Sequence, residues 1–264
     1  MTQGPSPFNA AAMLAFVSPA KTLDYARPVP DIAPTRPRFA EEAAALAAAA
    51  SKLSKKKLSE LMHISDKLAA LNAERFRGFG EQEERAAIYA FAGDVYAGFE
   101  VHSLDEEAVL FAQDHLRILS GLYGLLRPLD AIRPYRLEMG TKWAPGRSAD
   151  LYGWWKGRIA EAVHEELAGH ESPVIINLAS KEYWTALGRH LDPSVPVIEI
   201  DFREEGPSGL RFNTFAAKRA RGMMARYICE HRIDRPEALK DFDSDGYAYD
   251  AANSDETRWR FTRT

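Results

Sequence analysis

The sequence predicts an α/β fold in which one compact domain places helices around a central mixed β-sheet. Short apolar runs typical of buried strands, at 14–17, 174–180 and 195–202, alternate with longer stretches of helical periodicity. No linker divides the 264 residues convincingly. A content of 46% hydrophobic and 27% charged residues is that of a soluble globular protein with a substantial core.

We expect residues 1–12, which are rich in Pro, Ala and polar residues, to form a flexible N-terminal extension to a single domain at 13–264. Met13 would then be the natural start. The first residues lack the basic segment of a signal peptide, and no apolar run approaches the roughly 20 residues that span a bilayer. The single cysteine, Cys229, cannot form an internal disulfide. We therefore predict a cytoplasmic protein, monomeric and without a membrane partner.

The sequence predicts neither a metal site nor a cofactor. Its seven histidines are scattered, and Cys229 and His231 lack the spacing and the company of a zinc site. The GxSxG, GxGxxG and HExxH motifs are absent.

The first predicted strand, 14–17, leads into the turn Ser18-Pro-Ala-Lys-Thr22. This turn has no glycine that would let backbone N–H groups surround a phosphate, so it is not a P-loop. Lys21 is either an anion contact or an ordinary surface lysine. Four prolines then predict a loop over 27–38, and a helix rich in alanine begins at Phe39.

Apolar residues between 58 and 71 predict two short helices around His63-Ile64-Ser65, the outline of a helix-hairpin-helix. In that motif the hairpin amides and a following lysine bind a nucleic-acid phosphate, a role that would fall to Lys67. The glycines usual in the hairpin are replaced by His63 and Ser65. A plain helical turn that packs on the core is the alternative.

Residues 91–98 predict a strand broken by a turn. Asp94 in that turn is either a turn-capping aspartate, the commoner use, or a catalytic or ribose-contacting acid. An amphipathic helix is expected over 105–119.

The stretch 117–140 is the most unusual segment of the chain. An apolar run predicted to be helical ends at glycines and at Pro128, and prolines then alternate with arginines and aromatic residues. From 117 to 147 there are six basic residues and two acidic ones. Arginines fixed on rigid turns beside Tyr123 and Tyr135 favour the wall of an anion-binding cleft. The alternative is a structural turn whose arginines pair with acids elsewhere.

In the last third, a helix is predicted over 150–168, and the strand 174–180 delivers Asn177 and Ser180 to its carboxyl end. A helix beginning at Lys181, a strand at 195–202 paired with one at 211–215, a helix at 216–232 and a closing hairpin follow.

The helix at 216–232 is predicted to pack through one face and to present basic residues on the other. Residues 211–226 contain five basic residues and no acid. An ordinary solvated face is the alternative, but such faces usually mix both signs of charge. The net charge of −4 argues against indiscriminate binding of polyanions, so the clustering of cations matters more than their total.

Eight segments occur in the order, and at about the separations, of the bacterial YaaA peroxide stress family, which the chain resembles from Met13 to the C-terminal hairpin. They are SPAKTLDY (18–25), ISDKLA (64–69), GDVY (93–96), LSGLYGLLRPLD (119–130), PYRLEMG (134–140), INLAS (176–180), AKRARGMMAR (217–226) and GY (246–247).

The resemblance implies a cytoplasmic protein of the hydrogen peroxide response that limits damage from intracellular free iron. It also implies binding of single- and double-stranded DNA through a helix-hairpin-helix and a positively charged cleft. The sequence offers no obvious set of iron ligands. The N-terminal extension lies outside the family pattern.

We therefore predict a DNA-binding protein without sequence specificity, and a binding role rather than an enzymatic one. The predicted DNA-binding residues are Lys21, Lys67, Arg127, Arg133, Arg136, Lys181, Lys218, Arg219, Arg221 and Arg226. The alternative is an enzyme that acts on a nucleotide or a nucleic-acid base with Lys21, Asp94 and Glu138. A third possibility is a regulatory protein that binds another protein through its dipolar surface.

Overall fold

In the computed structural model, residues 13–168, 173–207 and 209–264 are described, and the predicted extension at 1–12 lies outside them. The main sheet has the strand order β11-β12-β9-β8-β1-β5-β6, with β10 paired to β9. Its strands are β1 (Met13–Val17), β5 (Leu116–Ser120), β6 (Gly124–Leu126), β8 (Val174–Asn177), β9 (Val197–Gly206), β10 (Gly209–Arg211), β11 (Ala248–Tyr249) and β12 (Arg258–Arg263).

The sheet is mixed, as the sequence predicts. Strands β5, β1, β8, β9 and β12 run parallel to one another, whereas β6, β10 and β11 pair antiparallel with their neighbours. Strand β1 lies between β5 and β8, and all five of its residues are buried. A strand covered on both faces has a continuous apolar sequence, and Met13–Val17 has one.

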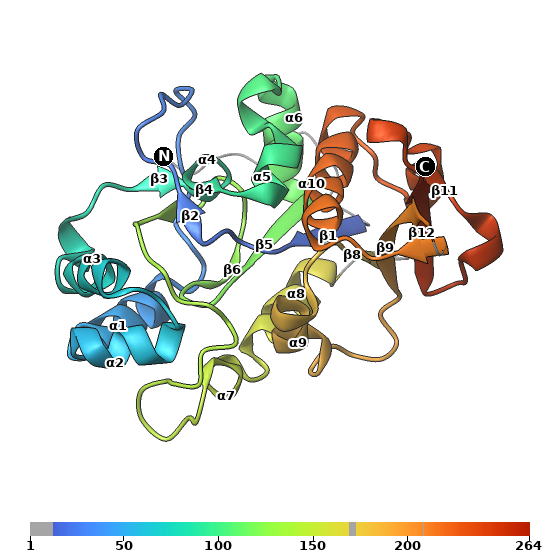
Figure 1. Cartoon of the computed structure of the whole chain (residues 1–264). Coiled ribbons are helices and arrows are strands. Elements are labelled where there is room, and N and C mark those ends of the chain that lie inside the picture. Colours follow the sequence, from blue (N-terminus) through green and yellow to red (C-terminus); the bar gives the residue numbers. More distant parts are fainter. Residues whose placement is uncertain (1–12, 169–172, 208) are drawn as a thin grey trace.

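Helices cover both faces of the sheet. One face carries α5 (Asp94–Phe99), α6 (Glu106–His115) and α10 (Thr214–Glu230), and the other carries α7 (Leu151–Trp155), α8 (Arg158–Leu167) and α9 (Lys181–Gly188) (Figure 1). Two small two-stranded sheets pair β2 (Thr22–Leu23) with β4 (Phe91–Ala92), and β3 (Arg85–Ala86) with β7 (Ala131–Ile132). The short helix α4 (Ala87–Ala90) connects β3 to β4.

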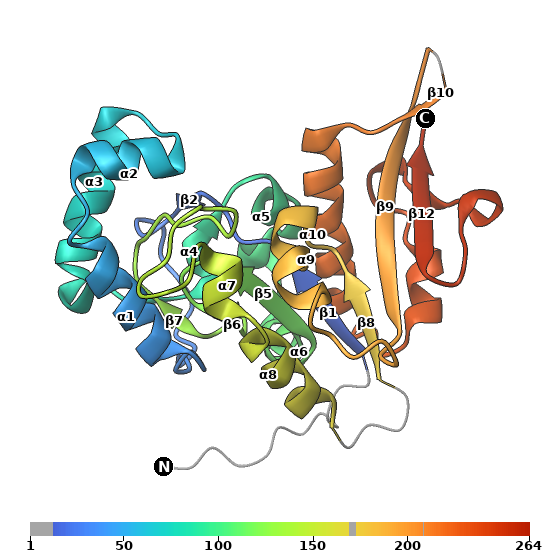
Figure 2. The same cartoon turned by 90° about the horizontal axis from the view of Figure 1, so that it is seen from below.

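Three helices form a lobe beside the sheet: α1 (Ala40–Ala50), α2 (Lys55–Met62) and α3 (Asp66–Arg77) (Figure 2). The two short helices predicted around His63 are present. His63 has a left-handed backbone with φ 50°, and the side chains of Ser54 and Ser65 cap α2 and α3. Ile64 is buried, which the alternative of a turn packed on the core also requires. The use of this turn as a nucleic-acid-binding hairpin stays a prediction.

The helix predicted over 105–119 is wrong in its last turn. Helix α6 ends at His115, and Leu116–Ser120 form β5, so the run predicted to be helical after Arg117 begins as a strand. All five residues of β5 are buried and it pairs with β1. A segment as short as LRILS fits either a buried strand or the last turn of a helix, so periodicity does not separate the two.

The broken strand predicted at 91–98 is confirmed at Phe91–Ala92, which form β4, and is wrong after Gly93, since Asp94–Phe99 form the helix α5. Val95, Tyr96 and Phe99 favour strands by intrinsic propensity, and tertiary packing against α10 overrides that preference. The predicted helix at 150–168 is two helices, because Lys156 has φ 41° and breaks the run before Gly157. The strand predicted at 211–215 ends at Arg211, and Thr214 begins α10.

No helix within 13–168, 173–207 and 209–264 combines the length and the hydropathy needed to span a bilayer.

Candidate functional site

The candidate site lies where three neighbouring parallel strands end. Strands β1, β5 and β8 end at Val17, Ser120 and Asn177, so the segments that follow them meet at one edge of the sheet. The backbone N–H of Ser180 donates a hydrogen bond to Ser18 Oγ at 2.9 Å. The turn after β1 is therefore joined directly to the turn after β8.

Lys21 and Glu138 are in contact at this edge. Lys21 Nζ lies 2.6 Å from Glu138 Oε2, and Arg136 Nη2 lies 3.2 Å from Glu138 Oε1. The Lys21 side chain is 60% exposed, whereas that of Glu138 is 20% exposed. Two of the three predicted catalytic candidates, distant in sequence, thus form one ion pair.

Asp94 belongs to the same edge but has a different partner. Its carboxylate lies 3.7 Å from Lys218 Nζ at the start of α10. Gly93, just before it, packs on the turn after β1, since a Cβ there would lie 3.3 Å from the Cβ of Ala20. Tyr96 Oη donates to the carbonyl of Ser18 at 3.3 Å. Asp94 is therefore held beside the Lys21 turn by α5.

A cavity of 760 Å³ opens next to Asp94. Its lining includes Tyr89, Phe91, Tyr96 and His102, with Asp24 and Arg27 nearer the surface. Burial raises the pKa of Tyr96 far above its ordinary value, so this hydroxyl stays protonated.

Two buried tyrosines, Tyr123 and Tyr135, pack next to the end of β5 at the site. Tyr135 Oη lies 2.7 Å from Ser120 Oγ, and the rings of Tyr123 and Tyr135 meet edge to face at 5.5 Å. Burial raises the pKa of Tyr123 to about 12 and that of Tyr135 above its ordinary value. These hydroxyls are neutral at physiological pH and act as hydrogen-bonding groups.

Glu182, Asn177 and Ser180 have structural contacts. Glu182 Oε1 accepts the backbone N–H of Gly140 at 2.8 Å, which joins the segment after Glu138 to α9. Asn177 Oδ1 accepts the backbone N–H of Ala179 at 3.0 Å. Lys181, the first residue of α9, is exposed at the edge.

Six of the ten predicted DNA-binding cations have a carboxylate within 4 Å. The pairs are Lys21–Glu138, Arg127–Asp130, Arg133–Glu84, Arg136–Glu138, Lys218–Asp94 and Arg226–Glu230. Within the described part of the chain, Lys67, Lys181, Arg219 and Arg221 have none.

Of the predicted arginines in the stretch 117–140, Arg136 shares Glu138 with Lys21, whereas Arg127 and Arg133 lie away from Lys21. Leu126 pairs with Ile118, so Arg127 lies near the amino end of β5, opposite the edge that carries Lys21. There it lines a separate hollow with Arg117 and Glu166. Arg133 pairs with Glu84, and its guanidinium lies 5.6 Å from the ring centre of Phe79. For these arginines the geometry matches the alternative of a structural turn.

The basic face predicted for α10 is divided. Arg221 is largely buried, and burial lowers the pKa of its guanidinium. Arg226, about 140° away around the helix axis, donates to the carbonyls of Phe99 and Glu100 and ties α10 to α5. Only Lys218 and Arg219 are exposed, in the first half of the helix.

Sequence reasoning missed Lys55, Lys56 and Lys57, which are all exposed in the first turn of α2. The run of three lysines was the available signal. It also gave Tyr96 no role, and it named Tyr135 only beside the arginines of 117–140; the fold brings both tyrosines to the strand edge.

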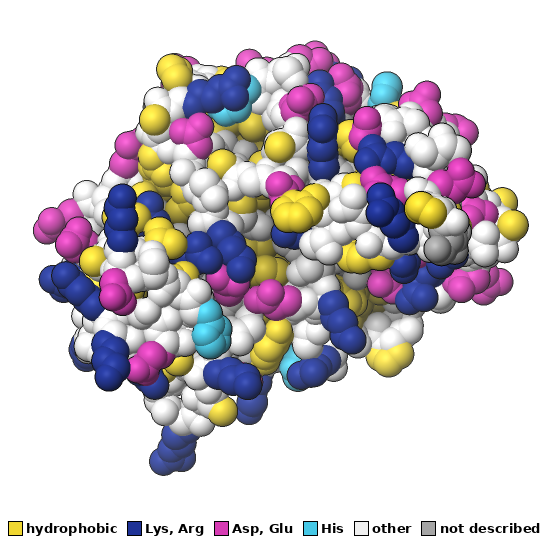
Figure 3. Space-filling view, viewed as in Figure 1, with side chains coloured by type: hydrophobic (Ala, Val, Ile, Leu, Met, Phe, Trp, Pro, Cys, Tyr) yellow, Lys and Arg dark blue, Asp and Glu magenta, His cyan; other side chains and the backbone are white. Residues whose placement is uncertain are grey.

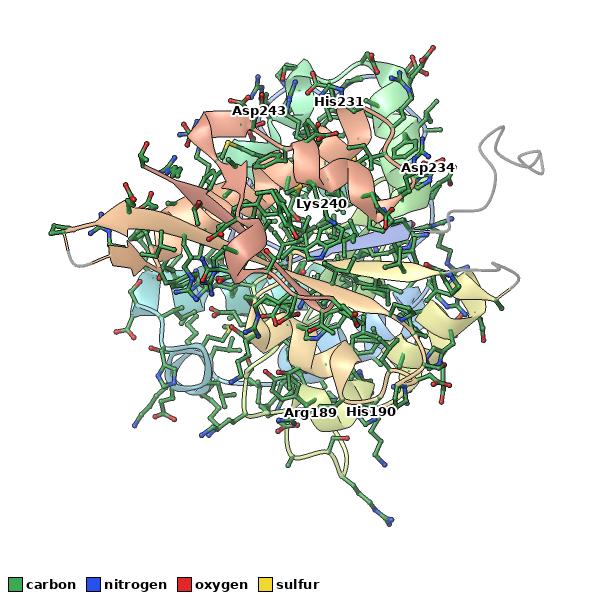
Figure 4. All side chains as sticks on the ribbon, turned by 90° about the vertical axis from the view of Figure 1, so that its right-hand side faces the viewer. Arg189, His190, His231, Asp234, Lys240 and Asp243 are labelled. Carbon is green, nitrogen blue, oxygen red and sulfur yellow. The ribbon has the colours of Figure 1, made fainter. Side chains whose placement is uncertain are left out.

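Among the residues that the structure describes, no group of three or more His, Cys, Asp or Glu side chains is arranged to hold a metal ion. His190 and His231 lie at opposite edges of the molecule (Figure 4). Cys229 is buried, and burial raises the pKa of its thiol.

Comparison with known proteins identifies the family. A family model described as "Peroxide stress protein YaaA" matches residues 13–253. A UPF0246 protein of Rhizorhabdus wittichii is 62% identical over 252 residues, which are 96% of this chain and 100% of that protein. UPF0246 proteins of Hahella chejuensis and Caulobacter vibrioides are each 47% identical, over 95% of this chain and 99% of theirs. The chain therefore belongs to the YaaA peroxide stress protein family.

Proposed function

We propose that this protein acts in peroxide defence in the cytoplasm by binding single- and double-stranded DNA without sequence specificity. Family membership supports the peroxide role. The observation that carries the DNA-binding role is that many exposed cations in the described parts of the chain have no carboxylate within 4 Å. We call eight of them the basic surface: Lys55, Lys56, Lys57, Lys67, Lys142, Arg147, Lys181 and Arg219.

The basic surface draws on α2, α3, α9, α10 and the loop before α7. Over α2, α7 and α9, one face of the molecule carries more Lys and Arg than Asp and Glu, whereas carboxylates gather toward its upper and right margins (Figure 3). Unpaired ammonium and guanidinium groups release DNA counterions on binding, but a cation already paired with a carboxylate has less to gain. Because the net charge is −4, phosphate contact is favoured where such cations gather and not over the whole surface.

The test is the salt dependence of DNA binding. Replacing Lys67 and Lys181 together by Ala should weaken binding to every duplex sequence. The slope of log K against log salt should fall in magnitude by about 0.9 for each phosphate that the variant no longer neutralises. Fluorescence anisotropy with a labelled duplex at several salt concentrations measures both quantities.

Arg258→Ala is the matched control, because it removes an exposed guanidinium that is paired with Glu199 at 2.9 Å. It should leave affinity and slope unchanged. Unchanged values in the Lys67 and Lys181 variant would contradict the basic surface.

We further propose that bound protein limits iron-dependent oxidative damage to DNA. This part rests on family membership. It predicts that the wild-type protein slows nicking of a plasmid by Fe²⁺ and hydrogen peroxide and that the variant lacking Lys67 and Lys181 does so less. If the wild type and the variant protect the plasmid equally, the protection does not depend on DNA binding, and this part of the proposal is contradicted.

A second candidate function is an enzyme that acts on a nucleotide or a nucleic-acid base. It is supported by the 2.6 Å contact of Lys21 with Glu138 and by the 760 Å³ cavity beside Asp94. A lysine and a carboxylate in contact form a proton donor and acceptor pair. Turnover of damaged DNA that Asp94→Ala or Glu138→Gln abolishes, with DNA binding intact, would establish it. No turnover across such substrates would refute it.

A further inference from the structure

Three large apolar side chains are exposed within six residues of one another. Phe215 is 72% exposed, Phe212 48% and Leu210 42%, the highest values among large hydrophobic residues in the described part of the chain. They lie on β10, at the start of α10 and between the two. Burying such a ring is favourable by a few kcal/mol, so clustered exposed rings indicate a binding surface.

Each ring has a cation beside it. Lys218 Nζ lies 5.8 Å from the centre of the Phe215 ring, and the Arg203 guanidinium lies 5.3 Å from that of Phe212. Arg211 and Arg219, next to them in sequence, are exposed. Arg203 lies 2.9 Å from Asp201 and Arg211 lies 3.9 Å from Glu204, whereas Arg219 has no carboxylate within 4 Å in the described part of the chain. The surface thus alternates flat apolar rings with positive charge.

The rings are mounted on a fixed support. Asn213, between them, caps α10 by accepting the backbone N–H groups of Phe215 and Ala216 at 3.1 and 3.3 Å. Its side-chain amide donates to Glu204 of β9 at 2.9 Å. Because Asn213 is tied to both α10 and β9, the backbone that carries the rings is set before any ligand binds.

We propose that Phe212 and Phe215 bind unpaired bases of single-stranded nucleic acid by stacking, while Lys218, Arg211 and Arg219 contact its phosphates. This inference rests on the proposed DNA-binding function and assigns its single-strand contacts. Base–aromatic stacking beside cations is the general mode of single-strand binding, and every base offers a flat face. A double helix keeps its bases stacked on each other, so these rings contribute little to duplex binding.

Charge and position select nucleic acid as the occupant. An apolar protein partner would use the rings alone, whereas single-stranded nucleic acid uses rings for its bases and cations for its phosphates. Arg219 has no carboxylate within 4 Å in the described part of the chain, whereas Arg203, Arg211 and Lys218 have one each and contribute less. Lys218 also connects the platform to the candidate site, since its ammonium lies 3.7 Å from Asp94, which lines the 760 Å³ cavity. A nucleotide that contacts both Phe215 and Lys218 would therefore lie close to the mouth of that cavity.

The experiment combines Phe212→Leu and Phe215→Leu in one protein, which keeps apolar bulk but removes both rings. The probe is oligo(dT) that contains one 2-aminopurine, whose fluorescence is quenched by stacking. We expect affinity for this strand to fall by about 5- to 150-fold for each stacking interaction removed, with less quenching. Duplex affinity and the salt slope should stay within twofold, because no cation is removed.

Two controls make the result specific. Phe215→Trp keeps a flat ring and should retain or increase affinity and quenching. Leu110→Ala removes an exposed apolar side chain, 39% exposed on α6, and should change neither. Thermal unfolding of each variant should match the wild type, since the substituted side chains are exposed.

Single-strand affinity that survives loss of both rings would overturn the stacking proposal and leave the proposed DNA binding intact. Wild-type protein that binds duplex but not oligo(dT) would do the same. Protein that binds neither would overturn both proposals. A wild-type dimer that the Leu substitutions dissociate, measured by analytical ultracentrifugation, would identify the rings as a contact between copies of the chain and also overturn the proposal.

Discussion

Gly98 and Gly222 allow the backbones of α5 and α10 to touch. A Cβ on Gly98 would lie 2.1 Å from the carbonyl oxygen of Arg219, and one on Gly222 would lie 1.8 Å from that of Val95. Backbone atoms of a packed helix cannot move away as a flexible side chain can. This contact positions Asp94, at the start of α5, beside Lys218 of α10.

Gly222→Ala should therefore destabilise the fold strongly. Overpacking of a close helix contact lowers the free energy of unfolding by about 1–3 kcal/mol, and by more where the added atom clashes with backbone. Urea unfolding followed by circular dichroism measures the change. Gly80→Ala is the control, since a Cβ there meets no atom within 4 Å, and it should stay within about 0.5 kcal/mol of the wild type. Similar stability of the two variants would contradict the close contact.

At the scale of elements, one carboxylate joins two strands and a helix. Glu204 of β9 accepts hydrogen bonds from Arg263 of β12 and from Asn213, the cap of α10. These hydrogen bonds hold the pKa of Glu204 below its ordinary value of 4.5. The same carboxylate thus supports the end of the sheet and the mounting of the exposed rings.

This depressed pKa makes stability depend on pH. In the window between the folded pKa and 4.5, the unfolded chain binds more protons than the folded one, so stability falls as pH falls. The stabilisation that the ionised Glu204 contributes is complete above pH 4.5, and it is lost as the pH falls below the pKa of Glu204 in the folded protein. Glu204→Gln should be less stable than the wild type at pH 7 and should lose less stability between pH 7 and pH 3.

Glu205→Gln is the neighbouring control, because Glu205 is exposed on the same strand. Chemical unfolding at several pH values compares the three proteins. An acid-induced loss that is the same in Glu204→Gln and the wild type would rule out this carboxylate as its source.

Across the whole molecule, the direction of the strands decides at which end of the sheet each predicted DNA-binding cation lies. Lys21 and Lys181 follow the carboxyl ends of β1 and β8, whereas Arg127 follows the antiparallel β6 and lies near the amino end of β5. Arg127 also forms an ion pair with the buried carboxylate of Asp130, at 3.3 Å. The side chain of Asp130 is 1% exposed, and burial raises its pKa above the ordinary value.

Arg127→Ala should accordingly reduce stability and leave DNA binding unchanged. Removing a hydrogen-bonding partner of a buried carboxylate costs on the order of 1–3 kcal/mol, although Thr35 still donates to Asp130. Lys67→Ala should do the reverse. Thermal unfolding and fluorescence anisotropy with a duplex, measured on both variants, test this pair of expectations. A loss of DNA affinity in Arg127→Ala would show that this arginine contacts DNA after all.

The sequence by itself determined the α/β class, the buried strands β1 and β8, the paired helices α2 and α3, and the family. These follow from local signals: unbroken apolar runs and helical periodicity, together with motifs such as the segment 18–25. It also brought Lys21, Asp94 and Glu138 into one hypothesis, and the fold holds all three at one edge.

Only the tertiary structure decided that 116–120 is a strand, that 94–99 is a helix, and which cations are free. Strand and helix compete closely in short apolar segments, and the contacts of β5 with β1 and of α5 with α10 settle the competition. A charge is neutralised by whatever carboxylate folding brings within a few ångströms. Glu84 for Arg133 and Glu138 for Lys21 come from distant parts of the chain, so sequence clustering alone does not reveal which charges remain available to a phosphate.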